Sequence, residues 1–255
     1  MPVIRKDAFG KIVLIKRLLI AILGLIGYYR LVIRNNARIE GMKHLKGLPK
    51  ENVLFVSNHQ TYFMDVVLMY MAFCANRNGF SKTVKNPFYL FNPVTSFYYV
   101  AAKETMDSSL FSKILAYTGA VTIKRTWREK GKEINRTVDL KDLSNIFKAL
   151  DNGWVVTFPQ GTTTPYAKGR KGIGHIIKHN KPIVVPIQID GFRKAFNKSG
   201  IMLKKRGTDI TLRFKEPIRF NGEEEPEEIL EVLMNQIGQS EENIPEMLRE
   251  KIQPK

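Results

Sequence analysis

The chain has 255 residues, of which 44% are hydrophobic and 25% are charged, which are the proportions of an ordinary globular protein. This balance excludes a globally disordered chain, and the length suffices for one substantial α/β domain or two small ones. The single cysteine, Cys74, excludes a disulfide framework and a thiolate metal cluster. Because Cys74 lies in an apolar run, we expect a buried, inert thiol in a reducing compartment.

The formal net charge is +17, and it is distributed unevenly along the chain. Residues 1–50 carry a net charge of +9 and residues 51–221 carry +15, whereas residues 222–255 carry −7. A strongly basic body favours a polyanionic partner, such as nucleic acid, an anionic membrane surface or a phosphorylated substrate. We divide the chain into an N-terminal helical region (1–40), an α/β domain (41–221) and an acidic helical tail (222–255) that packs on the domain or trails from it.

The first predicted element is an apolar helix. Twelve uncharged, mostly apolar residues, Leu18 to Tyr29, lie between Arg17 and Arg30. This run is shorter than the about 20 residues of a spanning helix, and no signal-peptide cleavage site follows it. We interpret it as a helix that lies in or dips into the cytoplasmic leaflet of a membrane, with its basic flanks at the headgroups. The alternative is a buried core helix.

Strand-like and helical segments alternate through the rest of the chain. The expected strands fall within residues 52–57, 97–106, 120–125, 154–159, 182–190 and 209–214. The expected helices fall within residues 65–76, 108–119, 138–153 and 224–238. This alternation predicts an α/β fold with a mixed, largely parallel sheet flanked by helices. Ligands of such sheets bind in the loops at the strand ends, so functional residues should follow strands directly.

His59 and Asp65 follow the first of these strands, in the segment VSNHQTYFMD. A neutral imidazole can deprotonate an alcohol when a partner on its other nitrogen fixes the tautomer, and Asp65 is a candidate for that partner. No G-x-S-x-G nucleophile motif accompanies the pair, so a catalytic His59 would activate the hydroxyl of the substrate itself. The alternative is a core histidine beside a helix-capping aspartate.

A second functional segment, TFPQGTTTPYAKGRKGIG (157–174), also follows a strand. Its glycines, threonines and cations, Lys168 and Arg170 among them, suit an anion if a helix begins at Ile173. It is not a Walker loop, because the G-x-x-x-x-G-K-[ST] order is missing. Arg125 ends the strand of GAVTIKR, where a guanidinium can hold a phosphate. Each of these cations also has a plainer interpretation as a solvated surface residue.

These segments, in this order, resemble the motifs of the glycerolipid acyltransferases of the lysophosphatidic acid acyltransferase type. NHQTYFMD is similar to their first motif, N-H-x4-D, and GAVTIKR is similar to their second, G-x-I-F-I-x-R. FPQGTTT is similar to their third motif, F-P-E-G-T-R-S, and IVVPIQI is similar to their fourth. The resemblance covers residues 50–190 or thereabouts, and four motifs in the right order are more specific than any one of them.

The resemblance implies that the protein transfers a fatty acyl chain from a thioester to a lipid hydroxyl. His59 would be the general base that takes the hydroxyl proton, and Asp65 would be its charge partner. Arg125 and Lys124 would bind the phosphate of the acceptor. The acceptor site would further include Gln160, Gly161, Thr162, Lys168 and Arg170.

Three departures from the motifs bear on the acceptor more than on the reaction. Five residues instead of four stand between His59 and Asp65. On a continuous helix the insertion would turn the aspartate by about 100°, so the two side chains can meet only if the segment starts as a loop. Gln160 replaces the usual glutamate, and Thr163 stands where an arginine is usual, so we expect a cation further along the loop to substitute for it.

We therefore expect a membrane-associated O-acyltransferase of phospholipid biosynthesis, on the cytoplasmic face of a membrane as a peripheral or monotopic protein. The expected donor is acyl-CoA or acyl carrier protein, the expected acceptor is 1-acyl-sn-glycerol-3-phosphate, and the product is phosphatidic acid. No metal, resident cofactor or nucleic-acid partner is expected. An alternative acceptor is another single-chain lipid, such as an amino-acid lipid. The alternative of a different class is a non-catalytic basic protein that binds membranes or RNA.

Overall fold

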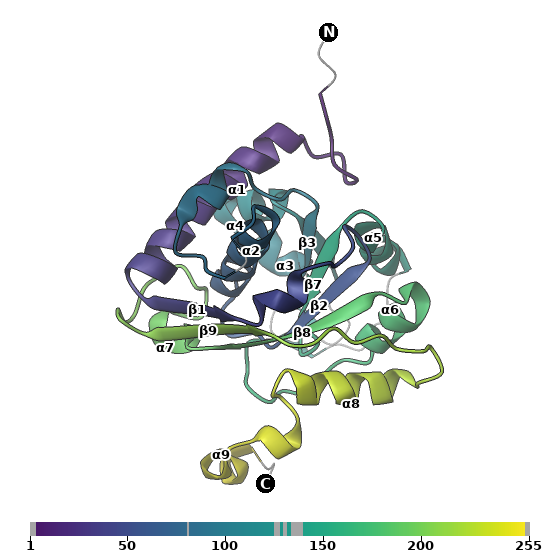
Figure 1. Ribbon diagram of the computed structural model, residues 1–255. Helices are drawn as coiled ribbons and strands as arrows, with labels where there is room; N and C mark the ends of the chain where they lie inside the picture. The colour runs from purple at the N-terminus through teal and green to yellow at the C-terminus, as the bar shows by residue number, and fades with distance from the viewer. Residues whose placement is uncertain (1–3, 81, 125–127, 130–131, 134–139, 253–255) are drawn as a thin grey trace.

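The computed structural model describes residues 4–80, 82–124, 128–129, 132–133 and 140–252 (Figure 1). Within these residues, seven strands form one mixed sheet in the order β1-β9-β8-β2-β7-β3-β4. The strands are β1 (Asn36–Glu40), β2 (Val53–Ser57), β3 (Phe97–Ala102), β4 (Ala120–Ile123), β7 (Trp154–Thr157), β8 (Ile183–Asp190) and β9 (Asp209–Phe214). A separate antiparallel pair joins β5 (Arg128–Glu129) to β6 (Lys132–Glu133). The predicted mixed, largely parallel sheet is confirmed.

Five neighbouring strands of the sheet, β8, β2, β7, β3 and β4, run in the same direction. β1 and β9 are parallel to each other, but β9 is antiparallel to β8. The carboxyl ends of the five parallel strands therefore share one edge of the sheet. The loops that follow them, which contain the predicted functional segments, begin at this edge.

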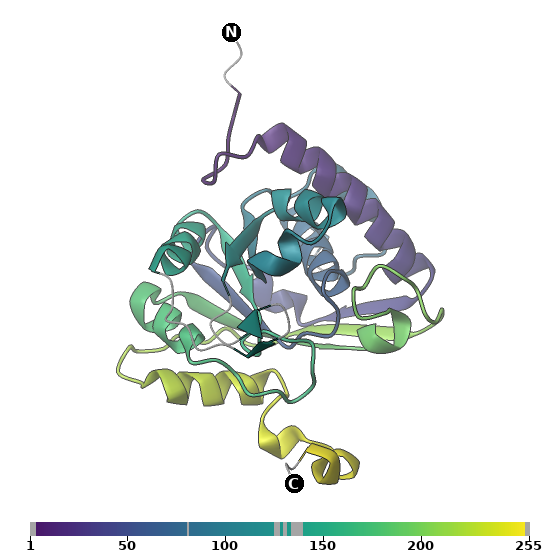
Figure 2. The same cartoon turned by 180° about the vertical axis from the view of Figure 1, so that it is seen from behind.

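Helices cover both faces of the sheet, as Figures 1 and 2 show from opposite sides. One layer contains α1 (Val13–Tyr28), the π-helical turn η1 (Tyr29–Ile33), η2 (Met42–Leu45), α2 (Met64–Arg77), η3 (Pro87–Phe91), α3 (Lys103–Met106), α4 (Leu110–Tyr117) and α7 (Phe192–Ala195). The other layer contains α5 (Leu140–Leu150), α6 (Gly172–Asn180) and α8 (Pro226–Gln236). The turn η4 (Glu241–Asn243) and α9 (Glu246–Ile252) follow α8.

Strand β2 lies between two apolar cores. Val53 and Phe55 pack with α2 in one core, whereas Leu54 and Val56 pack with α5 and α6 in the other. Successive side chains of a strand point to opposite faces, and both faces are covered here, which explains why the strand is apolar from Val53 to Val56. Cys74 is buried in the first core, and burial raises the pKa of its thiol to about 12, as expected for an inert cysteine.

Two of the predicted helices begin at recognisable caps. The hydroxyl of Ser109 accepts a hydrogen bond from the backbone N–H of Ser112 at the start of α4. Glu225 and Glu228 form a capping box at the start of α8, where Pro226 occupies the first turn. Helix α8 then packs against α6, so this part of the acidic tail covers the domain.

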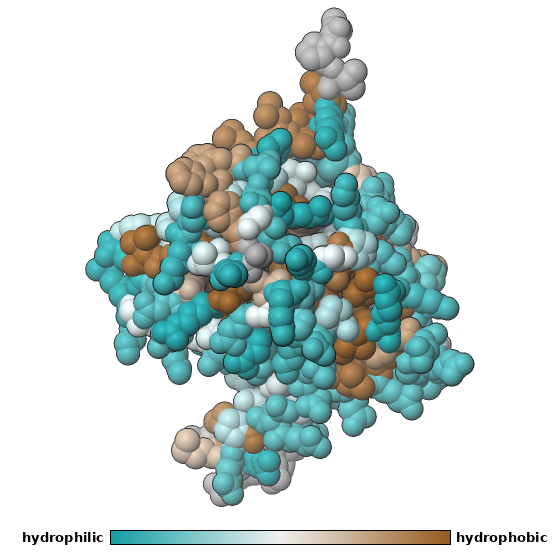
Figure 3. Space-filling model, viewed as in Figure 1, coloured by the Kyte–Doolittle hydropathy of each residue, from teal (hydrophilic) through white to brown (hydrophobic). Residues whose placement is uncertain are grey.

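Helix α1 buries only one of its faces. Gly24 and Gly27 lie against Leu90 and Val67, so closely that a Cβ on either glycine would overlap these side chains. The opposite face exposes the apolar residues Leu14, Leu18, Ile22, Leu25 and Ile26, and η1 continues it with Tyr29 and Ile33. Apolar side chains gather along α1 at the upper left of Figure 3. Helix α1 is therefore buried on one face, as the alternative of a core helix predicts, and exposed on the other. No helix in the described part of the chain has the length and apolarity needed to cross a membrane.

Candidate active site

His59 lies in the loop after β2, at the carboxyl edge of the parallel strands. The loop is attached to β8 by Asn58, which is buried. Its side-chain amide donates to the carbonyl of Ile189 at 2.9 Å and accepts from the N–H of Ile189 at 2.8 Å. This pairing extends the contact of the two strands by one residue and fixes the point from which His59 projects.

The imidazole of His59 meets the carboxylate of Asp65. His59 Nδ1 lies 2.9 Å from Asp65 Oδ2, and the Asp65 side chain is fully buried while that of His59 is 14% exposed. Helix α2 begins only at Met64, so the preceding residues form a bend and absorb the additional residue of the motif. The condition predicted for the pairing, a segment that starts as a loop, is confirmed. Because the carboxylate accepts the Nδ1 hydrogen, Nε2 keeps its lone pair for a proton from a substrate.

Asp65 is held by further donors from the same bend. Its carboxylate accepts hydrogen bonds from the backbone N–H of Gln60 at 2.6 Å and of Thr61 at 3.0 Å. The hydroxyl of Thr61 donates to the other carboxylate oxygen at 2.6 Å. These bonds satisfy both oxygens of a fully buried carboxylate and fix its orientation toward His59.

Two residues that were not predicted as site residues also hold the site. The ring of Phe158, which follows β7, stacks on the His59 ring with centroids 4.0 Å apart and an angle of 23° between the planes. Arg193 of α7 donates to the carbonyl oxygens of His59 and Thr163, and so joins the first and third motifs. Burial lowers the pKa of the Arg193 guanidinium, and the charges of Asp65 and Asp190 partly offset this effect. The one signal for Arg193 in the sequence is its place directly after a strand of the parallel block.

A cavity of about 400 Å³ opens beside His59. Its walls come from the carboxyl ends of β3, β4 and β7, the loop after β7, and the starts of α5 and α6. Four of the predicted binding residues line it: Lys124, Gly161, Thr162 and Arg170. Lys171 and Lys198 line it as well, so the cavity has a cationic side. Lys168 is exposed and is not among the described residues that line the cavity, and Arg125 lies outside the described residues.

Gln160 requires a correction. The sequence predicts it in the acceptor site, but its side chain is 1% exposed and is not among the described residues that line the cavity. Its amide nitrogen donates to the carbonyl of Ala167 at 2.9 Å and to Oε1 of Gln239 at 3.1 Å. Gln239 Oε1 also accepts the backbone N–H of Tyr166 at 2.9 Å. Gln160 therefore ties the loop to itself and to the segment after α8, because its buried amide donates to these two acceptors.

A small apolar pocket of about 40 Å³ adjoins this cavity, between α1, α2 and α4. Ile20, Leu23 and Leu115 are among the residues that line it. Tyr62, Val66 and Tyr99 line both this pocket and the larger cavity. An apolar chain attached to a group near His59 could therefore extend toward α1.

Comparisons with known proteins agree with this geometry. A family profile described as Acyltransferase matches residues 36–190, which is more than half of the chain and includes both motif loops. A solved structure with the same fold is the 1-acyl-sn-glycerophosphate (LPA) acyltransferase PlsC from Thermotoga maritima. It is 19% identical, its TM-score is 0.50, and the match covers 87% of this chain and 76% of that one. No curated protein matches the chain. The match favours an enzyme over the non-catalytic alternative, and the chain belongs to the Acyltransferase family.

Proposed function

We propose that the enzyme transfers a fatty acyl group from an acyl thioester to the hydroxyl of a lysophospholipid at a membrane surface. The thioester is acyl-CoA or acyl-acyl carrier protein, and the acceptor is 1-acyl-sn-glycerol-3-phosphate, which becomes phosphatidic acid. One observation carries this proposal. His59, oriented by Asp65 at 2.9 Å, faces a cavity with cations on one side and an apolar pocket beside it.

The reaction needs one base and no enzyme nucleophile. His59 Nε2 accepts the proton of the acceptor hydroxyl while its oxygen attacks the thioester carbonyl carbon. The new C–O bond forms a tetrahedral intermediate, whose collapse breaks the C–S bond. The leaving thiolate then takes the proton from His59. Asp65 stabilises the imidazolium between these two transfers, because its charge lies 2.9 Å from Nδ1.

The cavity suits an acceptor with a phosphate and an acyl chain. Lys124, Arg170 and Lys198 on its walls provide positive charge for a phosphate. The adjoining apolar pocket suits hydrocarbon, which gains from leaving water. Arg125, one residue beyond Lys124, keeps its predicted phosphate role, and Arg125→Ala should raise KM for phosphate-bearing lysolipids.

The exposed apolar face of α1 supports a location at the membrane. Leu14, Leu18 and Ile22 repeat at a spacing of four residues, so they share one side of the helix. A helix of this kind lies in the interface with its apolar side in the acyl region. Such a position would present the catalytic cavity to lipids that already reside in the bilayer.

A second acceptor class is favoured by one observation. Thr163 lines the cavity where the motif usually has an arginine, and Gln160 is turned away from it. These two positions therefore contribute no charge to the cavity, where the motifs imply a glutamate and an arginine. The cavity would tolerate a less anionic headgroup, such as that of a single-chain amino-acid lipid.

The proposal is tested by acyl transfer assays with wild type and His59→Ala. Each protein is offered 1-acyl-sn-glycerol-3-phosphate, other lysophospholipids and single-chain amino-acid lipids, with acyl-CoA and acyl-acyl carrier protein as donors. We expect the wild type to acylate the phosphate-bearing lysolipid fastest and His59→Ala to lose activity on the order of 1,000-fold. Full activity in His59→Ala would refute the catalytic assignment, and a preference for the amino-acid lipids would select the second acceptor class.

A further inference from the structure

Residues 194–206, which we name the basic hairpin, comprise the last two residues of α7 and the segment that follows it toward β9. Within this segment Lys194, Lys198, Lys204, Lys205 and Arg206 are exposed, and residues 191–208 include no acidic residue. Its tip also exposes two aliphatic side chains, Ile201 at 37% and Met202 at 67%. The hairpin thus combines positive charge with an apolar tip, and of these residues the acyl transfer proposed above uses only Lys198, which lines the cavity.

Hydrogen bonds within the hairpin hold it in a defined conformation. The backbone N–H of Asn197 donates to Met202 O at 3.0 Å, and that of Lys204 donates to Ala195 O at 2.7 Å. The side chain of Asn197 accepts hydrogen bonds from Ser199 and from the N–H of Met202. These bonds fix the tip, so its exposed side chains keep their place on the surface.

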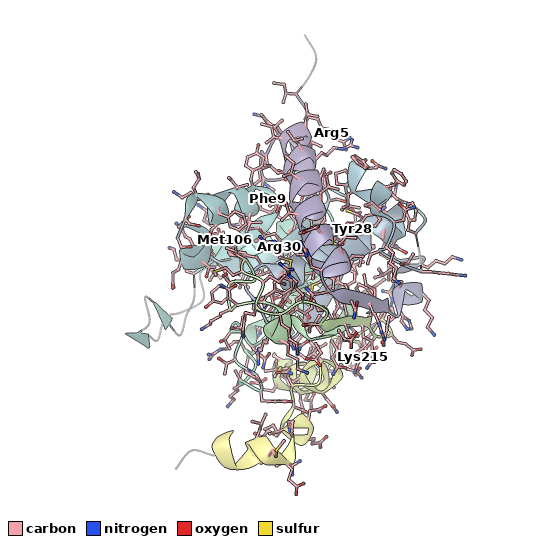
Figure 4. The ribbon with its side chains drawn as sticks, turned by 90° about the vertical axis from the view of Figure 1, so that its left-hand side faces the viewer. Arg5, Phe9, Tyr28, Arg30, Met106 and Lys215 are labelled. Atoms are coloured by element: carbon pink, nitrogen blue, oxygen red, sulfur yellow. The ribbon has the colours of Figure 1, made fainter. Side chains whose placement is uncertain are left out.

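The tip of the hairpin lies beside the end of the exposed apolar face of α1. The guanidinium of Arg30, in η1, donates to the carbonyl of Ile201, and the N–H of Gly207 donates to Arg34 O at 2.9 Å. Figure 4 looks onto α1 and shows Arg30 near the end of the helix where η1 begins. The apolar face of α1 and η1 therefore continues to a second exposed apolar site, with cations around it.

We propose that the basic hairpin is a second contact with an anionic phospholipid bilayer, beside that made by α1. This inference rests on the proposed function, because the enzyme must meet a lipid acceptor at a membrane. Cations attract an anionic leaflet, and an aliphatic tip gains by entering its acyl boundary. Single-stranded RNA would instead need aromatic side chains for stacking, and the aromatic residue of this segment, Phe196, is buried.

The hairpin also supports the first motif. The N–H of Tyr62 donates to Lys198 O at 3.0 Å, and a Cβ on Gly200 would lie 2.9 Å from Met64 N. Lys198 itself lines the catalytic cavity. The membrane contact therefore adjoins the bend that orients Asp65. Binding of the hairpin to a bilayer would place the cavity next to the lipid surface.

The charge of the hairpin is tested by sedimentation with phosphatidylcholine vesicles, with and without phosphatidylglycerol. The variant Lys194→Gln/Lys205→Gln/Arg206→Gln should bind the anionic vesicles about 100-fold more weakly, since each cation near the surface contributes about fivefold. The matched control, Lys43→Gln/Lys46→Gln/Lys50→Gln, removes the same charge before β2, at the opposite edge of the sheet. It should bind nearly as the wild type does. Equal losses in the two variants, or no loss in the hairpin variant, would overturn the proposal.

The apolar tip is tested separately with Met202→Asp, which should weaken binding to both kinds of vesicle about tenfold. Its control is Met247→Asp in α9, where the methionine is 87% exposed, and this variant should bind as the wild type does. Unchanged vesicle binding by Met202→Asp would refute insertion of the tip. Acyl transfer to a short-chain acceptor without vesicles should be equal in all these variants. A wild type without that activity would refute the proposed function, whereas the vesicle assay reports on the hairpin alone.

Discussion

Two buried aspartates with almost the same surroundings lie in different parts of the molecule. Asp65 meets His59 Nδ1 at 2.9 Å, and Asp7, before α1, meets Lys16 Nζ at 3.0 Å. Each carboxylate also accepts two backbone N–H groups, from Gln60 and Thr61 or from Phe9 and Lys11. The two sites differ in what lies beyond the partner.

His59 faces a cavity of about 400 Å³, whereas the Lys16 side chain is fully buried and its Nζ lies 4.6 Å from the Tyr98 ring centre. A proton on His59 can therefore exchange with a substrate, and a proton on Lys16 cannot. The difference teaches that a buried carboxylate and its hydrogen-bonded partner are a candidate for catalysis only when one of the two faces space for a ligand. Asp7 and Lys16 instead fasten the segment before α1 to that helix, and Lys16 in turn lies against Tyr98 of β3.

The largest expected effect is a difference in kcat between variants of the two aspartates. Asp65→Asn should lower kcat at least about 100-fold, because the amide neither stabilises an imidazolium nor enforces the tautomer. Asp7→Asn is its matched control and should keep the turnover of the wild type per folded molecule. Steady-state kinetics on both variants would contradict the comparison if Asp7→Asn lost activity to the same extent.

The next largest expected effect is a loss of stability when the Asp7–Lys16 pair is broken. Lys16→Met should reduce the free energy of unfolding by about 3 kcal/mol, because it leaves the buried carboxylate of Asp7 without its counter-charge. The measurement is the midpoint of urea unfolding, with the m-value checked for constancy. Lys6→Met, which removes an exposed lysine of the same segment, should leave the midpoint nearly unchanged. A midpoint of Lys16→Met equal to that of Lys6→Met would show that the pair does not fasten the segment.

A smaller effect is expected from Gln160→Glu, which restores the residue usual in the third motif. The carboxylate would face the carbonyl of Ala167 and Oε1 of Gln239, both acceptors. We expect a loss of stability of about 1–3 kcal/mol and a higher KM for the acceptor, because the loop also forms a wall of the cavity. Gln236→Glu places the same charge at the end of α8 and serves as the control. If Gln160→Glu had the same stability and KM as the wild type, the hydrogen bond between Gln160 and Gln239 would not be what holds the loop.

The smallest expected effect is a dependence of stability on pH, caused by Lys11, which lies in the same segment as Asp7. Burial, together with the charge of Lys16, lowers the pKa of Lys11 to about 8 from its ordinary 10.5. Between these two values the unfolded chain binds more protons than the folded one, so stability should rise with pH. Urea midpoints measured from pH 8 to 10.5 should show this rise in the wild type and a flatter profile in Lys11→Met. Identical profiles would mean that Lys11 titrates normally in the fold.

Much of the fold follows from local patterns. The apolar run at residues 52–57 becomes β2, Val53–Ser57, and the amphipathic segment 138–153 becomes α5, Leu140–Leu150. Burial on one or both faces imposes these periodicities directly on neighbouring residues, so they can be recognised without knowledge of the partners. The place of His59 directly after a strand was predicted from the same apolar run. The carboxyl ends of the parallel strands share one edge of the sheet, so a residue that follows β2 directly lies at that edge.

The supporting contacts of the site did not follow from local patterns. Phe158 is 99 residues from the imidazole on which it stacks, and Gln160 is 79 residues from Gln239. Motif position alone placed Gln160 in the acceptor site, and its burial under the loop corrected that prediction. The catalytic role of His59, the acyl donor, the acceptor and the membrane location stay predictions that the experiments above address.

The sequence by itself determined the class of the fold, the order of its main elements and the family, because periodicity and motif spacing are properties of neighbouring residues. The tertiary structure alone decided which side chains meet. It bends the chain before Met64 so that Asp65 reaches His59, turns Gln160 away from the cavity, and brings Arg193 against the carbonyls of two motifs. The contacts of Gln160 with Gln239 and of Arg193 with Thr163 depend on the packing of segments far apart in the chain, which no local pattern encodes.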